Sequence, residues 1–177
     1  MAFTKEMAME ILYAGDISEF NQARTYNEEE LLDLSEVDFT DFNLTDANLS
    51  FTDLNGTNFT EMELQGVNFT GSDLTSASFL RTTIVDTDFT GANLNGAIFV
   101  GSNCQGNFTD ADVSGADFFD GDFSESDFTL SVNMSLCKFD NYTVWPDSSN
   151  LPDDFDSEYV ADSIVDDEDD ISSPDSY

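Results

Sequence analysis

The sequence has no histidine, and only four of its 177 residues are basic. Without histidine the chain cannot form a Ser-His-Asp triad or an imidazole metal site. The basic residues, Lys5, Arg24, Arg81 and Lys138, stand against 38 Asp and Glu, which gives a formal net charge of −34. Because phosphate binding depends on Lys and Arg, we expect the chain to contact neither nucleic acid nor an anionic membrane surface directly.

Other absences narrow the function further. The sequence contains no apolar run long enough to span a bilayer, no phosphate-binding Gly-Lys-Ser/Thr loop and no dinucleotide-binding fingerprint. Its first stretch carries Glu6 and Glu10 within an apolar segment, which is atypical of a signal peptide. We therefore expect a cytoplasmic protein that is not an enzyme and uses no metal or other cofactor.

The dominant pattern is a five-residue repeat between residues 32 and 146. Each unit has a small or apolar residue, then Asp or Asn, then a Leu or Phe that we call the centre, then mostly Ser or Thr, and then a variable residue. The spacing shortens by one residue before Phe108 and lengthens by one before Met134, and both irregularities are predicted to be local loops. The predicted centres are Leu34, Phe39, Leu44, Leu49, Leu54, Phe59, Leu64, Phe69, Leu74, Phe79, Ile84, Phe89, Leu94, Phe99, Cys104, Phe108, Val113, Phe118, Phe123, Phe128, Met134, Phe139 and Val144.

A five-residue period fits neither an α-helix nor a flat strand, whose apolar periods are 3.6 and 2. Every fourth centre, however, collects like residues. A chain that makes a quarter-turn at each unit would stack these like residues on one another, with neighbouring coils sharing one core. The sequence therefore predicts an all-β fold, a four-sided parallel β-solenoid of about six coils. One of the four sets consists only of phenylalanine: Phe39, Phe59, Phe79, Phe99, Phe118 and Phe139.

The repeat unit, of the form A(D/N)Lxx, resembles that of the pentapeptide-repeat proteins over about two-thirds of the chain. The resemblance implies a right-handed quadrilateral parallel β-helix. It is far less specific for function, although some members of the family look like duplex DNA and shield gyrase from inhibitors. Residues 142–146, Tyr-Thr-Val-Trp-Pro, also resemble the end of many such chains, where an aromatic residue seals the last coil.

The two ends of the chain differ from its middle. In residues 1–31, apolar residues recur at helical spacing, Gly15 is expected to end a first helix, and Asp16 to cap a second. This helical segment is predicted to cover the open core and strand edges at one end of the 32–146 solenoid. Residues 147–177 hold twelve acidic residues and no basic one, which predicts a largely disordered acidic tail.

Within the coils, the centres and the small residues are predicted to point inward. The Asp or Asn before each centre points outward and bonds nearby backbone. Cys104 and Cys137 then both face inward, about 10 Å apart, which is too far for a disulfide. Corners can require a positive φ, which suits glycine. Glycine fills the last position of the unit at Gly56, Gly66, Gly71, Gly91, Gly96, Gly101 and Gly115.

Three functions remain open. The chain is a rigid rod that presents β-faces to a protein partner, a mimic of duplex DNA that inhibits or protects an enzyme such as gyrase, or a structural component of a larger assembly such as a particle surface. Neither the partner's identity nor the oligomeric state follows from the sequence.

Residues 117–122 faintly resemble a calcium loop, but they lack the ligand spacing and closing Glu of an EF-hand. The candidates for an acidic, DNA-like face are Asp41, Glu61, Asp86, Asp117, Asp120, Asp122 and Glu125.

One face departs from this polar pattern. On the all-phenylalanine side, the residue after the centre is apolar on three successive coils, as Leu80, Val100 and Phe119. Ile98 replaces the usual Asp or Asn on the same side, and Arg81 is the only base of the middle coils. A soluble monomer usually avoids such a contiguous outward stripe. These five residues are the candidates for binding a protein partner, unless the N-terminal cap, a loop or the tail covers them.

Overall fold

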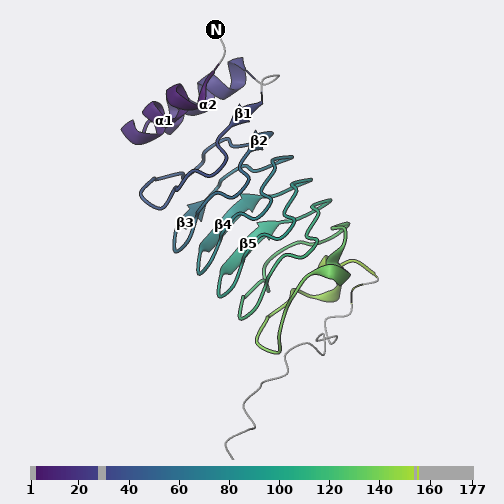
Figure 1. The fold of residues 1–177 in the computed structure, drawn as a ribbon. Helices are drawn as coiled ribbons and strands as arrows, with labels where there is room; N and C mark the ends of the chain where they lie inside the picture. The colour runs from purple at the N-terminus through teal and green to yellow at the C-terminus, as the bar shows by residue number, and fades with distance from the viewer. Residues whose placement is uncertain (1–2, 28–30, 154, 156–177) are drawn as a thin grey trace, which may run out of the picture.

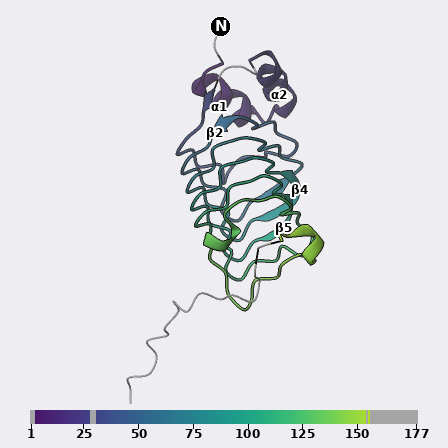
Figure 2. The same cartoon turned by 90° about the vertical axis from the view of Figure 1, so that its right-hand side faces the viewer.

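The computed structural model describes residues 3–27, 31–153 and 155. The chain forms a rod of stacked coils with a pair of helices at one end (Figure 1). A view turned by 90° shows the coils lying beneath one another along the rod, below the helices (Figure 2). The fold is the four-sided parallel β-solenoid that the repeat predicted, in the form of the right-handed quadrilateral β-helix that the family resemblance implied. No helix of the described segments is both long and apolar enough to cross a bilayer.

The N-terminal cap consists of α1 (Lys5–Ala14) and α2 (Ile17–Tyr26). Gly15 ends α1 in the left-handed conformation, with φ of 72°, and donates its N–H to the last turn. Asp16 begins α2 by accepting a hydrogen bond from the N–H of Glu19 at 2.9 Å. Both roles were predicted from the sequence and are confirmed.

Side chains of α2 satisfy the backbone of the first coil. The amide of Asn21 donates to the carbonyl of Asp46 and accepts from the N–H of Asn48, both at 2.8 Å. Arg24 is buried and donates to the carbonyl of Ser50 at 2.6 Å. These groups would otherwise be left open at the end of the solenoid, so α2 takes the place of a preceding coil.

The strands are short and parallel, and each coil takes about twenty residues. β1 pairs with β2, and β3, β4 and β5 form a three-stranded sheet in that order. Isolated parallel bridges such as Asp38 to Asn58 continue the ladder on the other sides. Side chains therefore alternate between core and solvent along each side. The strands are β1 (Leu32–Asp33), β2 (Thr52–Asp53), β3 (Glu63–Gln65), β4 (Thr83–Asp88) and β5 (Asn103–Asn107).

Two ladders of phenylalanine rings fill much of the core. In the first, Phe79 is stacked on Phe59 and Phe99, with ring centroids 5.0 and 4.7 Å apart. The rings meet those of the second ladder edge-on, as Phe79 and Phe89 do at 5.7 Å and 86°. Each aromatic side chain is thus fixed by stacking along the rod and by edge contacts across it. The second ladder consists of Phe69, Phe89, Phe108 and Phe128.

The two predicted irregularities are local, as expected. The shortened step corresponds to a bulge in β4, where the pairing with β5 shifts between Val85 and Thr87. The lengthened step corresponds to Asn133, which adopts a left-handed conformation before the 3₁₀ helix η1 (Met134–Leu136). The pairing of successive coils therefore continues past both irregularities, as Asp117 with Lys138 shows after the second.

The predicted register fails at the last centre. Val144 was expected to point inward, but it is 47% exposed and pairs with Asp122, which precedes a centre. Trp145 is the inward residue, with its ring stacked on that of Phe123 at 5.8 Å. The cause is one additional residue between Lys138 and Val144, which pair with Asp117 and Asp122, and it moves the repeat by one position.

The rod continues beyond Pro146. The 3₁₀ helix η2 (Ser148–Asn150) leads to Phe155, whose ring packs against Trp145 with centroids 5.0 Å apart. The N–H of Phe128 donates to the carbonyl of Asn150 at 2.8 Å. These residues close the end of the core. The prediction of a disordered acidic tail also covers residue 154 and residues 156–177, which lie outside the described range.

Candidate functional site

The residues of the predicted apolar stripe occupy equivalent places on successive coils. The carbonyl of Leu80 accepts a hydrogen bond from the N–H of Glu61, and that of Val100 from Arg81, both at 2.9 Å. Phe119 accepts the corresponding bond one coil further on. All three side chains are half-buried. At a strand spacing of about 4.8 Å, side chains so placed lie within reach of one another.

Ile98 and Arg81 border these three residues. Ile98 pairs with Ser78 and Asp117 in the parallel ladder and is 39% exposed. Arg81 stands at the adjacent corner, exposed, with its guanidinium 3.6 Å from the carboxylate of Glu61. We refer below to Leu80, Ile98, Val100 and Phe119 as the apolar stripe.

The helical cap docks elsewhere. Lys5 donates to the carbonyl of Ser35 at 2.7 Å, and Asn21 and Arg24 bond residues 46–50, all in the first coil. The apolar stripe begins only in the third coil. The cap is therefore held away from the stripe, and this removes one of the coverings considered from the sequence.

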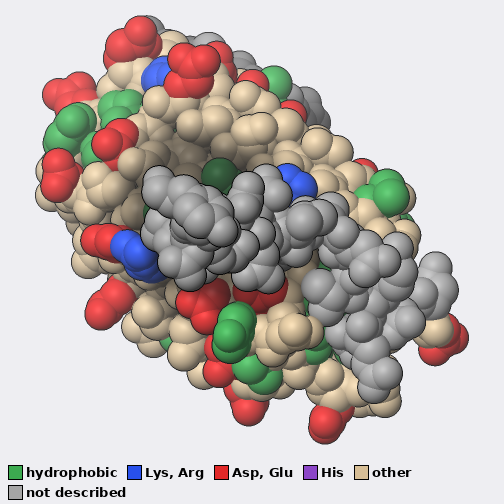
Figure 3. Space-filling model, turned by 60° about the horizontal axis from the view of Figure 1, so that its bottom comes forward, with side chains coloured by type: hydrophobic (Ala, Val, Ile, Leu, Met, Phe, Trp, Pro, Cys, Tyr) green, Lys and Arg blue, Asp and Glu red, His purple; other side chains and the backbone are tan. Residues whose placement is uncertain are grey.

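The candidate acidic residues do not converge on one point. Glu61 and Asp120 lie in the same corner column as Arg81, whereas Asp86 lies at the bulge of β4. At the C-terminal end of the rod, Asp and Glu side chains are seen at many places around the rim (Figure 3). Asp117 is half-buried, and the other six candidates, Asp41, Glu61, Asp86, Asp120, Asp122 and Glu125, are exposed.

Many outward carboxylates are bonded within their own unit. The carboxylate of Asp38 accepts hydrogen bonds from the N–H and the hydroxyl of Thr40. These bonds, the one from the N–H most of all, lower the pKa of its carboxyl. Asp33 accepts from the hydroxyl and the N–H of Ser35, which likewise lowers its pKa. Asp117 accepts from the N–H of Phe119 at 3.2 Å. Over the described residues, no three His, Cys, Asp or Glu are grouped so as to hold a metal ion.

A second surface lies between the first coil and β3. On three sides the first coil is bridged to the second, as at Asn48 and Asn68. On the fourth side, no bridge joins Asn43 to Glu63 within the described chain, although Glu63 itself pairs with Thr83 on the next coil. The strand bridges on this side therefore end at β3. At the following corner the first coil is still joined to β3, because the N–H of Asp46 donates to the carbonyl of Gln65 at 2.9 Å.

Bulky residues explain this gap. Phe42 and Met62 occupy the position that the repeat gives to a small residue. On the later coils the same position holds Thr82, which donates its hydroxyl to the carbonyl of Phe59 at 2.7 Å, and Ser102, which is bonded in a similar way within its own coil. Neither Phe nor Met can make such a bond, and a phenylalanine ring does not fit the small inner position. The side of the first coil that carries these residues consequently lacks the bridge from Asn43 to Glu63 within the described chain.

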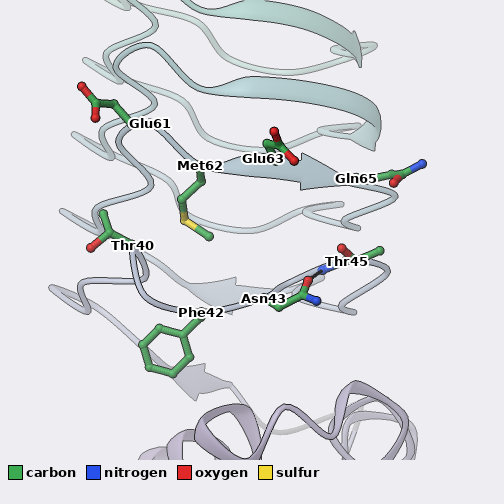
Figure 4. A pocket seen from close by; sticks show the side chains of 8 residues that line it. All are labelled: Thr40, Phe42, Asn43, Thr45, Glu61, Met62, Glu63 and Gln65. Atoms are coloured by element: carbon green, nitrogen blue, oxygen red, sulfur yellow. Dashed lines mark hydrogen bonds between the residues drawn. The ribbon is translucent and has the colours of Figure 1, made fainter.

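The resulting groove encloses about 390 Å³. Met62 points into the gap below β3, whereas Phe42 points away from it toward the helices (Figure 4). The ring of Phe42 packs against Tyr13 at 4.7 Å. We call this the first-coil groove. Sequence reasoning missed it, although the signal was present in two bulky residues at small positions. Its lining residues are Thr40, Phe42, Asn43, Thr45, Glu61, Met62, Glu63 and Gln65.

Solved structures of several pentapeptide-repeat proteins align with this chain at low TM-scores. Rfr23 from the cyanobacterium Cyanothece 51142 is 19% identical, with 72% of this chain and 99% of that chain covered and a TM-score of 0.34. Full-length QnrB1, a plasmid-mediated fluoroquinolone resistance protein, is 19% identical, with 63% and 62% covered and a TM-score of 0.32. HetL, involved in heterocyst differentiation regulation in the cyanobacterium Nostoc sp. strain PCC 7120, is 13% identical, with 64% and 57% covered and a TM-score of 0.24. The chain thus spans less than two-thirds of QnrB1 and of HetL.

No curated protein sequence matches the chain. The family model for pentapeptide repeats matches with eight copies, over residues 32–61, 43–81, 54–91, 63–101 and 85–129. These matches run without a break from residue 32 to residue 129, which is more than half of the sequence. The chain belongs to the family of pentapeptide-repeat proteins.

Proposed function

We propose that the protein is a non-enzymatic interaction module, a rigid acidic rod that binds a protein partner through the apolar stripe. The observation that carries this proposal is the equivalent placement of Leu80, Val100 and Phe119 on three successive coils. Their neighbour Ile98 is 39% exposed where the repeat normally places Asp or Asn. Monomeric soluble proteins usually avoid contiguous apolar patches of this kind.

The dimensions of the stripe fit a small docking patch. Four apolar side chains over three coils present on the order of a few hundred Å², less than a standard protein interface. Arg81, exposed at the edge, supplies a planar donor fork that orients a partner carboxylate. A partner that carries an apolar strip beside an acidic residue matches this arrangement.

The test compares variants that place a charge inside and outside the stripe. Leu80→Asp and Val100→Asp should abolish partner capture and leave the melting temperature unchanged. Ser124→Asp, an exposed control that also follows a centre, should change neither. Capture from the native cell and sedimentation velocity measure binding, and circular dichroism measures melting.

Two outcomes would contradict the proposal. If Val100→Asp lowers the melting temperature strongly, the stripe is covered within the chain, because an unpaired charge would then be buried. If the variant melts normally and still captures every partner, the stripe is not a docking site. Loss of self-association alone would support the structural alternative, in which copies of the rod assemble with one another.

DNA mimicry is a second candidate, favoured by the net charge of −34. Six acids fall on the most acidic side, over a rod of roughly 28 Å, or about one per 5 Å. Duplex DNA carries one charge per ~1.7 Å, so a single side is too sparse and two adjacent sides would have to act together. Mimicry predicts a complex with gyrase that DNA competes away and salt weakens. Absence of binding at ~50 mM salt would remove this candidate. The side meant here carries Asp38, Asp41, Glu61, Asp117, Asp120 and Asp140.

A further inference from the structure

We propose that the first-coil groove binds an extended peptide segment that carries lysine or arginine, which pairs with the open edge of β3. The proposal concerns a different surface from the apolar stripe and does not depend on it. It is carried by the broken ladder, by the unpaired backbone groups at the break and by the charge of the lining.

The backbone at the break offers both a donor and an acceptor. On the preceding side of the same coils, the N–H of Asn58 donates to Val37 at 3.0 Å and the carbonyl of Asn58 accepts from Phe39 at 2.9 Å. Glu63 holds the equivalent position at the groove. In the part of the chain that the structure describes, neither its N–H nor its carbonyl makes the corresponding bond to the first coil. One residue of an extended peptide can satisfy both groups, as in strand addition at a sheet edge.

The opposite wall is open in the same way. The N–H of Leu44 and the carbonyl of Phe42 would complete the ladder with Glu63, and neither has a hydrogen bond within the described residues. Backbone groups left without partners are costly where water is excluded. A peptide lying in the groove therefore gains hydrogen bonds on the β3 side and faces further unpaired groups on the other.

The side chains of the groove select a basic occupant. Glu61 and Glu63 are exposed at its edge, and among the described residues Arg81 is the one cation that pairs there, with Glu61 at 3.6 Å. The net charge of −34 repels acidic peptides and nucleic acids. Met62, 7% exposed, provides an apolar floor against which the aliphatic stem of a lysine or arginine can lie.

The size of the groove fits a short segment. Its 390 Å³ lies near the lower end of the roughly 300–1,000 Å³ range of ligand sites. The break is confined to one side: the ladder is intact at Asn58 before it, and the bond from the N–H of Asp46 to the carbonyl of Gln65, at 2.9 Å, closes it at the next corner. The contact therefore involves a few residues of the peptide, with the basic side chain directed at Glu61 and Glu63.

The experiment titrates the full chain with a blocked peptide of alternating valine and lysine. A peptide in which glutamate replaces lysine serves as the ligand control. The double variant Phe42→Thr/Met62→Thr restores small hydroxyl residues and should close the groove, as Thr82 does one coil later. It leaves the net charge unchanged, so it separates groove binding from general attraction to an acidic rod. Backbone amide NMR signals of Glu63 and Leu44 report occupation directly.

The lysine peptide should bind the wild type and shift the amide signals of Glu63 and Leu44, whereas the glutamate peptide should not bind. The affinity of the double variant for the lysine peptide should be lower by about tenfold or more. Equal binding to wild type and double variant, or no binding to either, would overturn the proposal. If the double variant fails to fold, Glu61→Gln/Glu63→Gln decides. This pair keeps the groove and should weaken binding about fivefold while both amide shifts persist at saturation; an unchanged affinity would count against the proposal. Val100→Asp should bind the peptide like the wild type, so failure here and failure of the stripe are distinguishable.

Discussion

The ring of Phe51 lies across the backbone of Gly71, one coil further along the same corner. A Cβ atom at Gly71 would stand 2.5 Å from Cε1 and 2.8 Å from Cδ1 of that ring. Both residues have positive φ, 51° and 63°. A large side chain at one corner thus depends on a glycine at the next, and the same relation holds between Asp46 and Gly66.

Replacement of Gly71 should therefore lower the free energy of unfolding by more than the strain of its backbone conformation alone. Gly71→Ala strains a left-handed residue, at about 1–2 kcal/mol, and also displaces the ring of Phe51. Gly91 has the same φ of 63°, but a Cβ atom added there would meet no other atom within 4 Å, so Gly91→Ala is a matched control. Urea denaturation should show the larger loss for Gly71→Ala, and Phe51→Ala should remove the difference. Equal losses in the two glycine variants would show that the ring contact is unimportant.

The phenylalanine ladder should be the most sensitive part of the core. Phe79 is fully buried between Phe59 and Phe99, so Phe79→Ala leaves a cavity and should cost about 3–5 kcal/mol of unfolding free energy. Tyr142→Ala, at a side chain 75% exposed, should change stability by no more than about 0.5 kcal/mol. Denaturant titration of both variants measures the contrast. A loss under about 1 kcal/mol at Phe79 would be incompatible with a shared, tightly packed core.

The sequence was sufficient to predict the fold because the same five-residue pattern recurs in every coil. The order of the coils, the helix boundary at Gly15 and Asp16, and the inward centres up to Phe139 all follow from local pattern. The inward position of Trp145 could not be predicted in this way. The repeat pattern is satisfied equally well whether the additional residue of the preceding turn is placed before Val144 or after it. The contact between Trp145 and Phe155, which decides the register, joins residues that the repeat does not relate.

The first-coil groove was not predicted for a different reason. A single departure from the repeat, such as Phe42, can be absorbed by a rotamer change or by displacement of the backbone. Here Tyr13 of the cap packs against the ring of Phe42, and Met62 points into the space below β3. The outcome depends on packing between the cap and the first coil, which the repeat does not encode.

Alkaline pH should destabilise the fold through Cys104. Burial raises the pKa of its thiol from 9.0 to about 12. The folded state therefore keeps a proton that the unfolded state releases above pH 9, and stability present below that pH is lost as the pH rises toward 12. The slope is about 1.4 kcal/mol per pH unit. Cys104→Ala should have a flatter stability profile between these values, measured by urea denaturation. Identical profiles for the two proteins would mean that the thiol titrates normally in the folded state.

The last prediction concerns like charges stacked along the rod. Asp33, Asp53 and Asp73 pair directly with one another on three successive coils. Like charges placed opposite one another on neighbouring strands destabilise a sheet. Asp53→Asn should therefore stabilise the protein by about 0.5–1 kcal/mol. The new amide keeps the oxygen that accepts the N–H of Asn55 at 3.1 Å. It also gains a donor for Asp33 on the preceding coil, as the amide of Asn93 donates to Asp73 on its preceding coil at 3.2 Å.

Asp88 provides the opposite case. It pairs with Asn68 and Asn107 rather than with other acids, and it accepts hydrogen bonds from Thr70 and Thr90. Asp88→Asn removes the same charge but leaves three amides in a row and weakens charge-assisted hydrogen bonds, so it should destabilise the protein. The gain at Asp53 should also shrink in ~1 M salt, where the Debye length falls to about 3 Å, because screening already relieves the repulsion there. If both substitutions stabilise equally, the general charge of the rod matters and the order of Asp and Asn along each column does not.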